Sequence, residues 1–575
     1  MRSGARSSLS RIAPGTALPL TVVLALCLVL PVSVFFVYGF WKSDLFGIHK
    51  NWNLDQYGSA LSGFYLEVLA KTLVTATVVA TVVVAIAYVA AFIVTFKVKR
   101  RQNLFVFLIV ASSLTSYLVR IYSWKTILGP QGLISKALEW LGVISEPATF
   151  LLYNRASVSI ALVQILIPFA FLPIYAAMQA VDRDLLNASR DLGATATQTF
   201  TRVLWPITSH GVAYAFAFSF IIAGGDYVTP EMLGGKSGIM TGRIINDQFG
   251  LTQNFSLASA LAFVLLAGFF VVLLALNFVR AHAHRVRLPR GLPNRHEAQA
   301  SKAGGSLWSG VFLGAMLIYL YVPLLVVLTL SVNDSSFASL PIRGFTLRWY
   351  ETVLGPGLYR SAFITSVEIA VVVSVLAIAI GVPSALALAR RTFIVRPVLL
   401  LALLACLGLP GIIIGFSIFS VLRELGLQPS LVSVVAGQLI VVLPFVVLTL
   451  MARVQRMDPS LEEAGRDLGC TPLGVFRRIT APLIIPVVIG AAVISFALSM
   501  DEFVVTHFTV GDRETFPVLI WAQLHRRGLD PSVNAAASVL VVSTLALLLI
   551  LALFSRSRSG REAARSFVPL EASKD

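Results

Sequence analysis

The chain has 575 residues, of which 57% are hydrophobic and only 13% are charged, and its formal net charge is +17. A soluble domain carries about 25% charged residues, so this composition excludes a soluble globular protein and indicates an integral membrane protein. The basic residues lie in short segments beside apolar runs, which is the pattern that sets membrane topology, so the surplus charge does not indicate nucleic-acid binding. The three cysteines have no paired spacing and predict neither a disulfide framework nor a metal site.

The apolar runs predict about 12 transmembrane helices, because roughly 20 residues of helix cross the hydrocarbon layer of a bilayer. The helices expected in the first half of the chain cover 18–40, 66–96, 104–123, 156–181, 207–225 and 256–279. Those expected in the second half cover 308–331, 362–389, 397–420, 431–452, 482–500 and 534–554. The first run is too long for a signal-peptide core and is interpreted as an uncleaved helix. The fold class predicted is an all-α integral membrane protein.

One tetrapeptide, RDLG, occurs twice, at 190–193 and at 466–469, and the two copies lie 276 residues apart. Each copy is followed by a proline 13 residues after its glycine and then by an apolar run that ends at Asp226 or Asp501. A repeat this long in an apolar chain predicts two homologous six-helix halves. The predicted domains are a first half (1–280), a linker (281–304) and a second half (305–575).

Loop charges predict the orientation in the membrane. Lysine and arginine are concentrated in three segments, 97–101, 280–302 and 556–565, whereas 226–256 and 501–532 hold more acidic than basic residues. Since basic loops stay on the cytoplasmic side, we expect both termini, the linker and both RDLG segments to be cytoplasmic.

The segments around the repeat are called here the first elbow (181–206) and the second elbow (457–482). Each predicts two short helices joined at a glycine, Gly193 or Gly469, that can adopt the left-handed conformation ending a helix. The second short helix of each elbow has a threonine as its expected N-cap: Thr195 or Thr471. Such an elbow is a rigid knob that another protein can hold. The alternative, an ordinary amphipathic loop, does not explain two copies at matched offsets.

The second elbow contains EEAGRDLG at 462–469, which resembles the EAA loop of ABC importer permeases. The resemblance implies that each elbow is a coupling helix that docks on a cytoplasmic ATPase subunit. The first elbow departs from the pattern, since 187–189 read Asn-Ala-Ser where the second elbow has Glu-Ala-Gly. The residues to which the resemblance assigns ATPase coupling are Arg190, Asp191, Gly193, Glu463, Ala464, Arg466, Asp467 and Gly469.

A narrower resemblance covers most of the chain. Two segments, 115–129 and 224–235, resemble one permease subunit of the spermidine/putrescine importers. Four others resemble its partner subunit: 331–337, 345–350, 499–511 and 531–545. The chain therefore looks like both permease subunits fused in one polypeptide, with the type I ABC importer permease fold.

This resemblance also implies the partners and the location of the protein. The expected partners are two cytoplasmic ATPase subunits, which would hold ATP and Mg, together with a periplasmic solute-binding protein and membrane lipid. The expected location is the bacterial inner membrane, and the expected substrate is a polyamine or a related small organic solute. The chain itself is expected to be no enzyme and to hold no cofactor.

Acidic and aromatic residues near the span ends are candidates for the substrate path, because ionisable residues in a bilayer are costly and indicate function. Two acidic sites suit a substrate with an amine at each end, and aromatic rings can contact ammonium groups. The candidates are Asp226, Tyr227, Asp501, Glu502, Glu368, Tyr117 and Trp124. The alternatives are that the acids lie in the headgroup region as helix ends or binding-protein contacts, and that Glu368 pairs with a polar group elsewhere in the bundle.

Two alternative functions are a secondary carrier and a non-transport membrane scaffold or enzyme. GGKS at 234–237 lacks the glycine that a phosphate-binding loop needs five positions before Gly235, where Pro230 stands, so no nucleotide site is expected. No sequence motif of catalysis or metal binding is present. A secondary carrier with six plus six helices fits the composition and topology equally well but gives no account of the paired elbows.

Overall fold

The computed structural model describes residues 13–44, 47–98, 100–113, 115–283, 307–335, 342, 344–527 and 531–556. These residues are mostly helical, and a short antiparallel hairpin joins β1 (Lys42–Asp44) to β2 (Gly47–His49). The chain packs as two units, named here for their place in the sequence. The central unit is Phe36–Phe345, and the terminal unit combines Met1–Phe35 with Thr346–Asp575.

The central unit is built around three long helices, α5 (Gly63–Phe92), α9 (Arg155–Gln179) and α12 (Trp205–Gly225), each of which packs against the other two. Close approach of α9 and α12 requires Gly211, whose added Cβ would lie 2.6 Å from the Pro173 carbonyl oxygen. The other elements of the unit are α4 (Asp55–Ala60), η2 (Ile93–Lys97), α6 (Gln102–Ser113), α7 (Tyr117–Leu128), α8 (Leu133–Trp140), η3 (Thr149–Leu151), α10 (Arg183–Asp191), α11 (Ala196–Thr199), η4 (Phe200–Leu204), η5 (Pro230–Gly234), α13 (Thr241–Gly250), α14 (Phe255–Ala283) and α15 (Leu307–Leu330).

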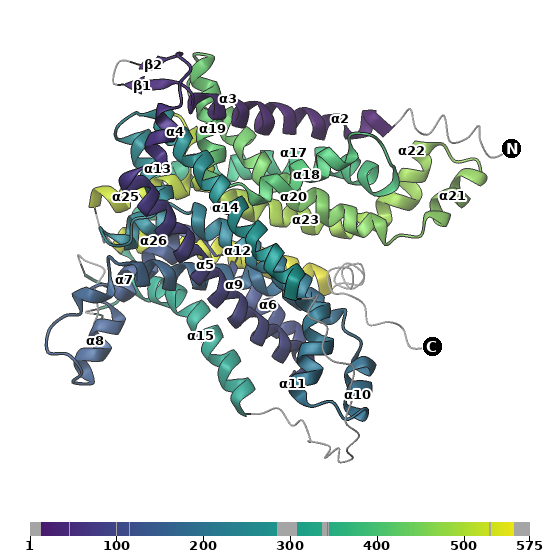
Figure 1. Ribbon diagram of the computed structural model, residues 1–575, viewed down its shortest axis with the longest axis horizontal. Coiled ribbons are helices and arrows are strands. Elements are labelled where there is room, and N and C mark those ends of the chain that lie inside the picture. Colours follow the sequence, from purple (N-terminus) through teal and green to yellow (C-terminus); the bar gives the residue numbers. More distant parts are fainter. Residues whose placement is uncertain are drawn as a thin grey trace. The chain divides into compact units, whose positions relative to one another are not determined.

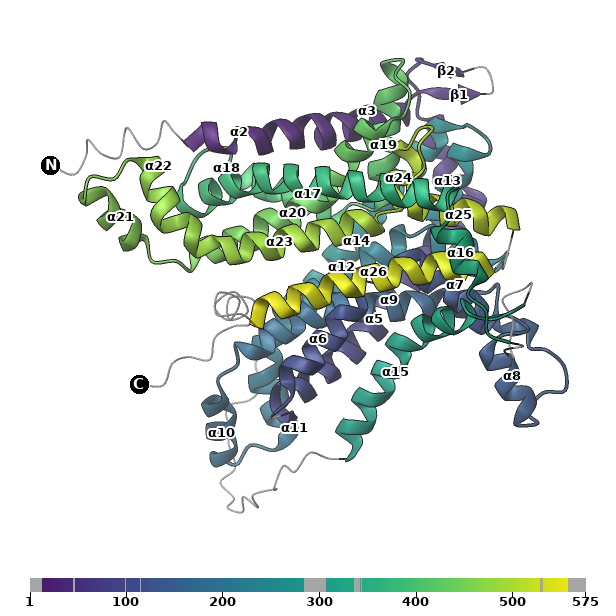
Figure 2. The ribbon, with the colours of Figure 1, turned by 180° about the vertical axis from the view of Figure 1, so that it is seen from behind.

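The terminal unit repeats this plan with α17 (Leu358–Arg390), α20 (Leu431–Gln455) and α23 (Ala481–Asp501). Gly381 allows the close approach of α17 and α20, since its added Cβ would lie 2.6 Å from Val446 Cγ1. The other elements are α2 (Ala13–Leu24), η1 (Ala25–Val29), α3 (Leu30–Tyr38, which extends past the unit boundary), α16 (Arg348–Leu354), α18 (Arg396–Gly408), α19 (Gly411–Glu424), α21 (Pro459–Asp467), α22 (Pro472–Val475), η6 (Phe476–Thr480), α24 (Val504–Thr509), α25 (Phe516–Arg527) and α26 (Pro531–Arg556). Figure 2 shows α16 beside α26, with which it packs.

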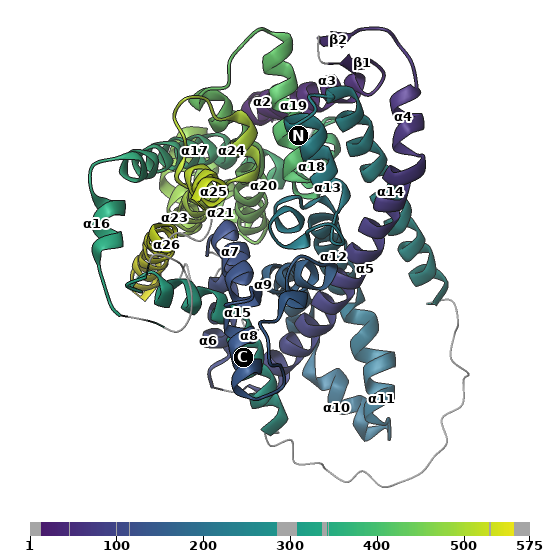
Figure 3. The same ribbon diagram turned by 90° about the vertical axis from the view of Figure 1, so that its left-hand side faces the viewer.

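The first helix of each sequence half packs in the unit of the other half. Helix α2 runs along α17 in the terminal unit (Figure 1), and α15 packs against α6 and α7 in the central unit (Figure 3). Two hydrogen bonds place α15 there: Tyr321 Oη donates to the Leu108 carbonyl oxygen at 2.8 Å, and Gln164 Nε2 donates to that of Leu320 at 2.9 Å. The packing units therefore differ in extent from the predicted halves 1–280 and 305–575. Of the predicted linker, 284–304 lie outside the described residues.

Nine helices in the described part of the chain are long and apolar enough to cross a membrane, or up to eleven if each of two bent pairs is one span. The expectation of an all-α membrane protein is confirmed, but the third predicted helix of each half is broken. The predicted helix 104–123 bends by 86° between α6 and α7, and 397–420 bends by 109° between α18 and α19.

Local chemistry explains both breaks. Leu409 precedes Pro410 and adopts the extended conformation (φ −88°, ψ 130°) that a following proline imposes. At the first break, the hydroxyls of Ser112, Ser113 and Thr115 donate to backbone carbonyls three residues back and so compete with the helical ladder.

Candidate functional site

The two elbows have the same backbone. Gly193 has φ 76° and Gly469 has φ 81°, so both adopt the left-handed conformation expected from the sequence. The two glycine N–H groups donate to the carbonyl oxygens of Arg190 at 2.8 Å and of Arg466 at 2.9 Å. The expected N-caps are also confirmed, since Thr195 accepts from Gln198 N and Thr471 accepts from Gly474 N.

Each elbow continues into a membrane helix through one turn of π-helix, η4 in the first and η6 in the second. The two turns begin at Phe200 and Phe476, which are matched positions of the 276-residue repeat. A π-turn is rare and often marks a functional site. Nothing in the sequence pattern predicted it.

The outer faces of the elbows are open to solvent. Every residue to which the resemblance assigned coupling is exposed: Arg190, Asp191, Gly193, Glu463, Ala464, Arg466, Asp467 and Gly469. Sequence reasoning missed two pairs of exposed leucines at matched positions. Leu185 and Leu461 are 51% and 47% exposed, and Leu192 and Leu468 are 73% and 86% exposed. Large apolar side chains at the same points of both elbows mark a surface that suits a protein partner.

In the central unit the structure brings Asp226 and Tyr117 together. Asp226 directly follows α12 and is buried, and its Oδ1 accepts hydrogen bonds from the Tyr117 hydroxyl and, at 3.0 Å, from the Val228 N–H. Burial raises the pKa of the Asp226 carboxyl, and its hydrogen bonds oppose that rise. Tyr227 is buried beside it in the chain. Trp124 lies further along α7 and packs instead against Tyr319, with ring centroids 5.6 Å apart.

In the terminal unit the Glu502 side chain stabilises the start of a helix. Its carboxylate accepts from the N–H groups of Val505 and Thr506, both at 2.9 Å, and so caps the start of α24. The Thr506 hydroxyl donates to the same carboxylate at 2.6 Å and accepts from Gln438 Nε2 of α20 at 2.9 Å. Asp501 is the last residue of α23 and is half-buried. The two acids are therefore not equivalent, although they are adjacent in the sequence.

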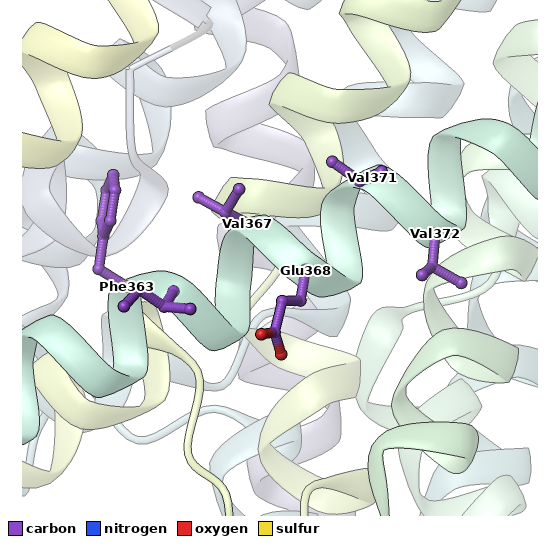
Figure 4. A pocket seen from close by; sticks show the side chains of 6 residues that line it. Phe363, Val367, Glu368, Val371 and Val372 are labelled. Atoms are coloured by element: carbon purple, nitrogen blue, oxygen red, sulfur yellow. The ribbon is translucent and has the colours of Figure 1, made fainter.

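Glu368 lies on α17 in an open depression that is lined by side chains of this helix alone: Phe363, Ile364, Val367, Val371 and Val372 (Figure 4). Its side chain is 55% exposed and forms an ion pair with Arg513, at 3.7 Å between Oε2 and Nη1. This carboxylate thus has a basic partner from the segment that follows α24. The depression is not an enclosed cavity.

Two buried polar residues of α26 were not anticipated. Asn534 and Ser538 lie one turn apart, both are fully buried, and their side-chain polar atoms have no hydrogen-bond partner. The only signal in the sequence was an asparagine and a serine four residues apart in an apolar run. Among the described residues, no group of three or more His, Cys, Asp or Glu is placed to hold a metal ion.

Comparison with known proteins identifies the family. The family described as "Binding-protein-dependent transport system inner membrane component" matches the chain twice, over residues 83–288 and 377–559. The spermidine/putrescine transport system permease protein PotC of Escherichia coli (strain K12) is 32% identical over 256 residues, which are 44% of this chain and 96% of PotC.

A second relative corresponds to the other permease subunit. The permease protein PotB of Salmonella typhimurium (strain LT2) is 30% identical over 208 residues, which are 36% of this chain and 72% of PotB. A crystal structure of a bacterial ABC transporter involved in the import of the acidic polysaccharide alginate aligns with 46% of this chain at 15% identity, with a TM-score of 0.35. The chain belongs to the inner membrane components of binding-protein-dependent ABC importers, with two permease domains fused in one polypeptide.

Proposed function

We propose that this permease carries polyamines or a related small organic cation into the cell, driven by two cytoplasmic ATPase subunits that dock on the two elbows. A periplasmic binding protein delivers the substrate, and the ATPase subunits hold ATP and Mg. The observation that carries the proposal is the pair of elbows, whose backbones, RDLG residues and exposed leucines match.

The docking has a physical basis in the exposed elbow faces. Each elbow presents a leucine at its tip, Leu192 or Leu468, next to the charged residues of the RDLG repeat. An exposed apolar side chain beside charged residues lets a partner bury apolar surface at the centre of the contact and pair charges around it. Coupling requires that the elbows bind the closed ATPase dimer more tightly than the open one, because only differential affinity shifts a conformational equilibrium.

A cationic substrate is supported by the chemistry of the span ends and by the names of the relatives. Asp226, which Tyr117 contacts, supplies a carboxylate beside an aromatic side chain in the central unit, and Asp501 supplies a carboxylate at the end of α23 in the terminal unit. Carboxylates and aromatic faces both attract ammonium groups. The relatives PotC and PotB are named for spermidine and putrescine transport. Glu502 is the weaker candidate, since its carboxylate already caps α24.

The test is ATP hydrolysis by the complex reconstituted in lipid with its ATPase and binding protein, with putrescine, spermidine and non-amine solutes supplied in turn. Stimulation by an amine supports the whole proposal. Stimulation of ATP hydrolysis by a non-amine solute alone supports the importer function and contradicts the cationic substrate. If no ATPase associates with the permease, the docking role of the elbows is wrong.

The orientation is also a proposal. We infer that the elbows, both termini and the linker are cytoplasmic, because lysine and arginine are concentrated in 97–101, 280–302 and 556–565 and basic loops stay on the cytoplasmic side. Of the last two segments, 284–302 and 557–565 lie outside the described residues. Labelling of Cys470, which is half-exposed on the second elbow, by a thiol reagent that does not cross membranes tests this orientation.

A further inference from the structure

The inner sides of the two elbows are held by different chemistry at matched positions. In the first elbow, Leu186 and Leu204 belong to one buried apolar cluster, against which Phe92 and Phe96 pack. The residues 276 positions later are Glu462 and Thr480. An apolar contact in one elbow is therefore replaced by a polar pair in the other.

The polar pair is completed by an arginine from a third element. The Thr480 hydroxyl donates to Glu462 Oε1 at 3.1 Å, and Arg390 Nε lies 3.6 Å from Glu462 Oε2. The Arg390 and Glu462 side chains are only 18% and 12% exposed. The two terminal nitrogens of Arg390 also donate to the carbonyl oxygen of Met457, both at 3.1 Å. One guanidinium therefore holds the chain just before α21 and a carboxylate on α21 itself.

At a second matched pair the first elbow has the polar contact and the second elbow has the apolar one. In the first elbow, the hydroxyls of Ser189 and Thr199 lie within hydrogen-bond distance, at 3.0 Å. In the second elbow the matched residues are Gly465 and Val475, and a Cβ added to Gly465 would lie 2.5 Å from Ile479 Cδ1. At these two matched pairs each elbow thus has one polar and one apolar contact, in opposite places, and the polar contact of the second elbow includes an ion pair. A charged residue also holds the first elbow, where Arg183 of α10 donates to the Thr95 carbonyl oxygen of η2 at 3.1 Å.

The charged contact joins three elements that the elbow must move together. Arg390 is the last residue of α17, Glu462 lies on α21, and Thr480 ends η6, which leads into α23. Removing one member of a largely buried ion pair leaves the other charge uncompensated, so this contact depends on both Arg390 and Glu462. A partner that displaces α21 therefore also displaces the ends of α17 and α23.

We infer that Arg390 and Glu462 are positioning residues for energy coupling, which pass the displacement of the second elbow to the membrane helices through an ion pair. This inference rests on the proposed docking of an ATPase subunit on each elbow. The first elbow passes the displacement through the packing of Leu186 and through Arg183, which binds the Thr95 carbonyl oxygen of η2 without forming an ion pair at the matched position. The two elbows then differ in the contacts that hold their inner sides to the membrane helices, as well as in their exposed residues.

The test uses the complete reconstituted complex and measures substrate transported per ATP hydrolysed, ATPase binding and thermal stability. We expect Glu462→Leu and Arg390→Met each to lower transport per ATP by about fivefold or more, the lower end of ordinary allosteric coupling, while the ATPase still binds. The exchange Arg390→Glu with Glu462→Arg should restore part of the loss. The control is Glu67→Gln, which breaks an exposed ion pair with Lys71 on α5 and should leave the ratio unchanged.

A variant in which the whole contact is apolar separates coupling from folding. The triple substitution Arg390→Leu, Glu462→Leu and Thr480→Leu removes every charge of the contact and keeps it apolar. A folded, ATPase-binding but uncoupled triple variant supports the inference. Full coupling in the triple variant, or in Glu462→Leu, overturns it. Failure of the unsubstituted complex to bind any ATPase counts against the proposed function instead, and so the two failures are distinguishable.

Discussion

The left-handed glycine of the second elbow allows a test in which conformation alone is changed. Gly469 has φ 81°, and a Cβ added there would meet no atom within 4 Å. A substitution therefore causes no clash, and its cost is the strain of a left-handed residue, about 1–2 kcal/mol for an ordinary L-amino acid. Asparagine tolerates this conformation far better, since its side chain bonds to its own backbone.

We expect Gly469→Val to weaken ATPase docking and Gly469→Asn to leave it nearly intact. A cost of 1–2 kcal/mol lowers the ratio of native to non-native elbow by about 5- to 30-fold, and this factor is the largest loss of docking affinity that the strain can cause. Titration of the lipid-reconstituted permease with purified ATPase measures this affinity, and the thermal stability of the membrane helices serves as the control. Unchanged affinity in the valine variant would show that the partner does not require this elbow geometry. An equal loss in both variants would point to crowding at the docking surface instead of backbone strain.

Three further predictions concern other surfaces. Leu192→Ser and Leu468→Ser should each weaken ATPase binding without lowering the melting temperature, since both side chains are more than two-thirds exposed; a fall in melting temperature with unchanged binding would contradict this. Asp226→Asn should lower cation uptake and remove the rise of uptake with pH. Burial raises the pKa of the Asp226 carboxyl, so raising the pH increases the ionised fraction that attracts a cation. Equal uptake–pH profiles of the unsubstituted protein and the variant would refute this prediction. Cys470 should react with an impermeant maleimide only in inside-out vesicles, and bound ATPase should protect it; labelling of intact cells would reverse the orientation.

The elbows were predictable because their signals are local. Gly193 and Gly469 end their helices for lack of a Cβ, and a threonine follows each at the capping position. The break before Pro410 could also have been predicted, because a residue that precedes proline avoids the helical conformation. The first break was harder to see, since it depends on serine and threonine hydroxyls that bond to backbone carbonyls.

The sequence identified the candidate substrate-path residues but did not distinguish their structural environments. Asp226 and Glu502 follow matching apolar runs, yet the first is buried against Tyr117 and the second caps α24. Both carboxylates accept backbone N–H groups, and the difference is that a tyrosine from another helix also reaches Asp226. The use of Glu462 on the inner side of the second elbow was missed for the same reason, because its partner Arg390 lies on a different helix.

The sequence by itself determined that the chain is a membrane protein with two related halves, because apolar length, loop charge and the RDLG repeat are properties of contiguous residues. It also determined the two elbows, whose form follows from glycine and capping residues. Only the tertiary structure decided that α2 packs with α17 and α15 with α7, that Tyr117 meets Asp226, and that Arg390 meets Glu462. Those contacts depend on which helix faces pack together, and apolar faces that are nearly equivalent in composition do not specify their neighbours until the whole bundle is assembled.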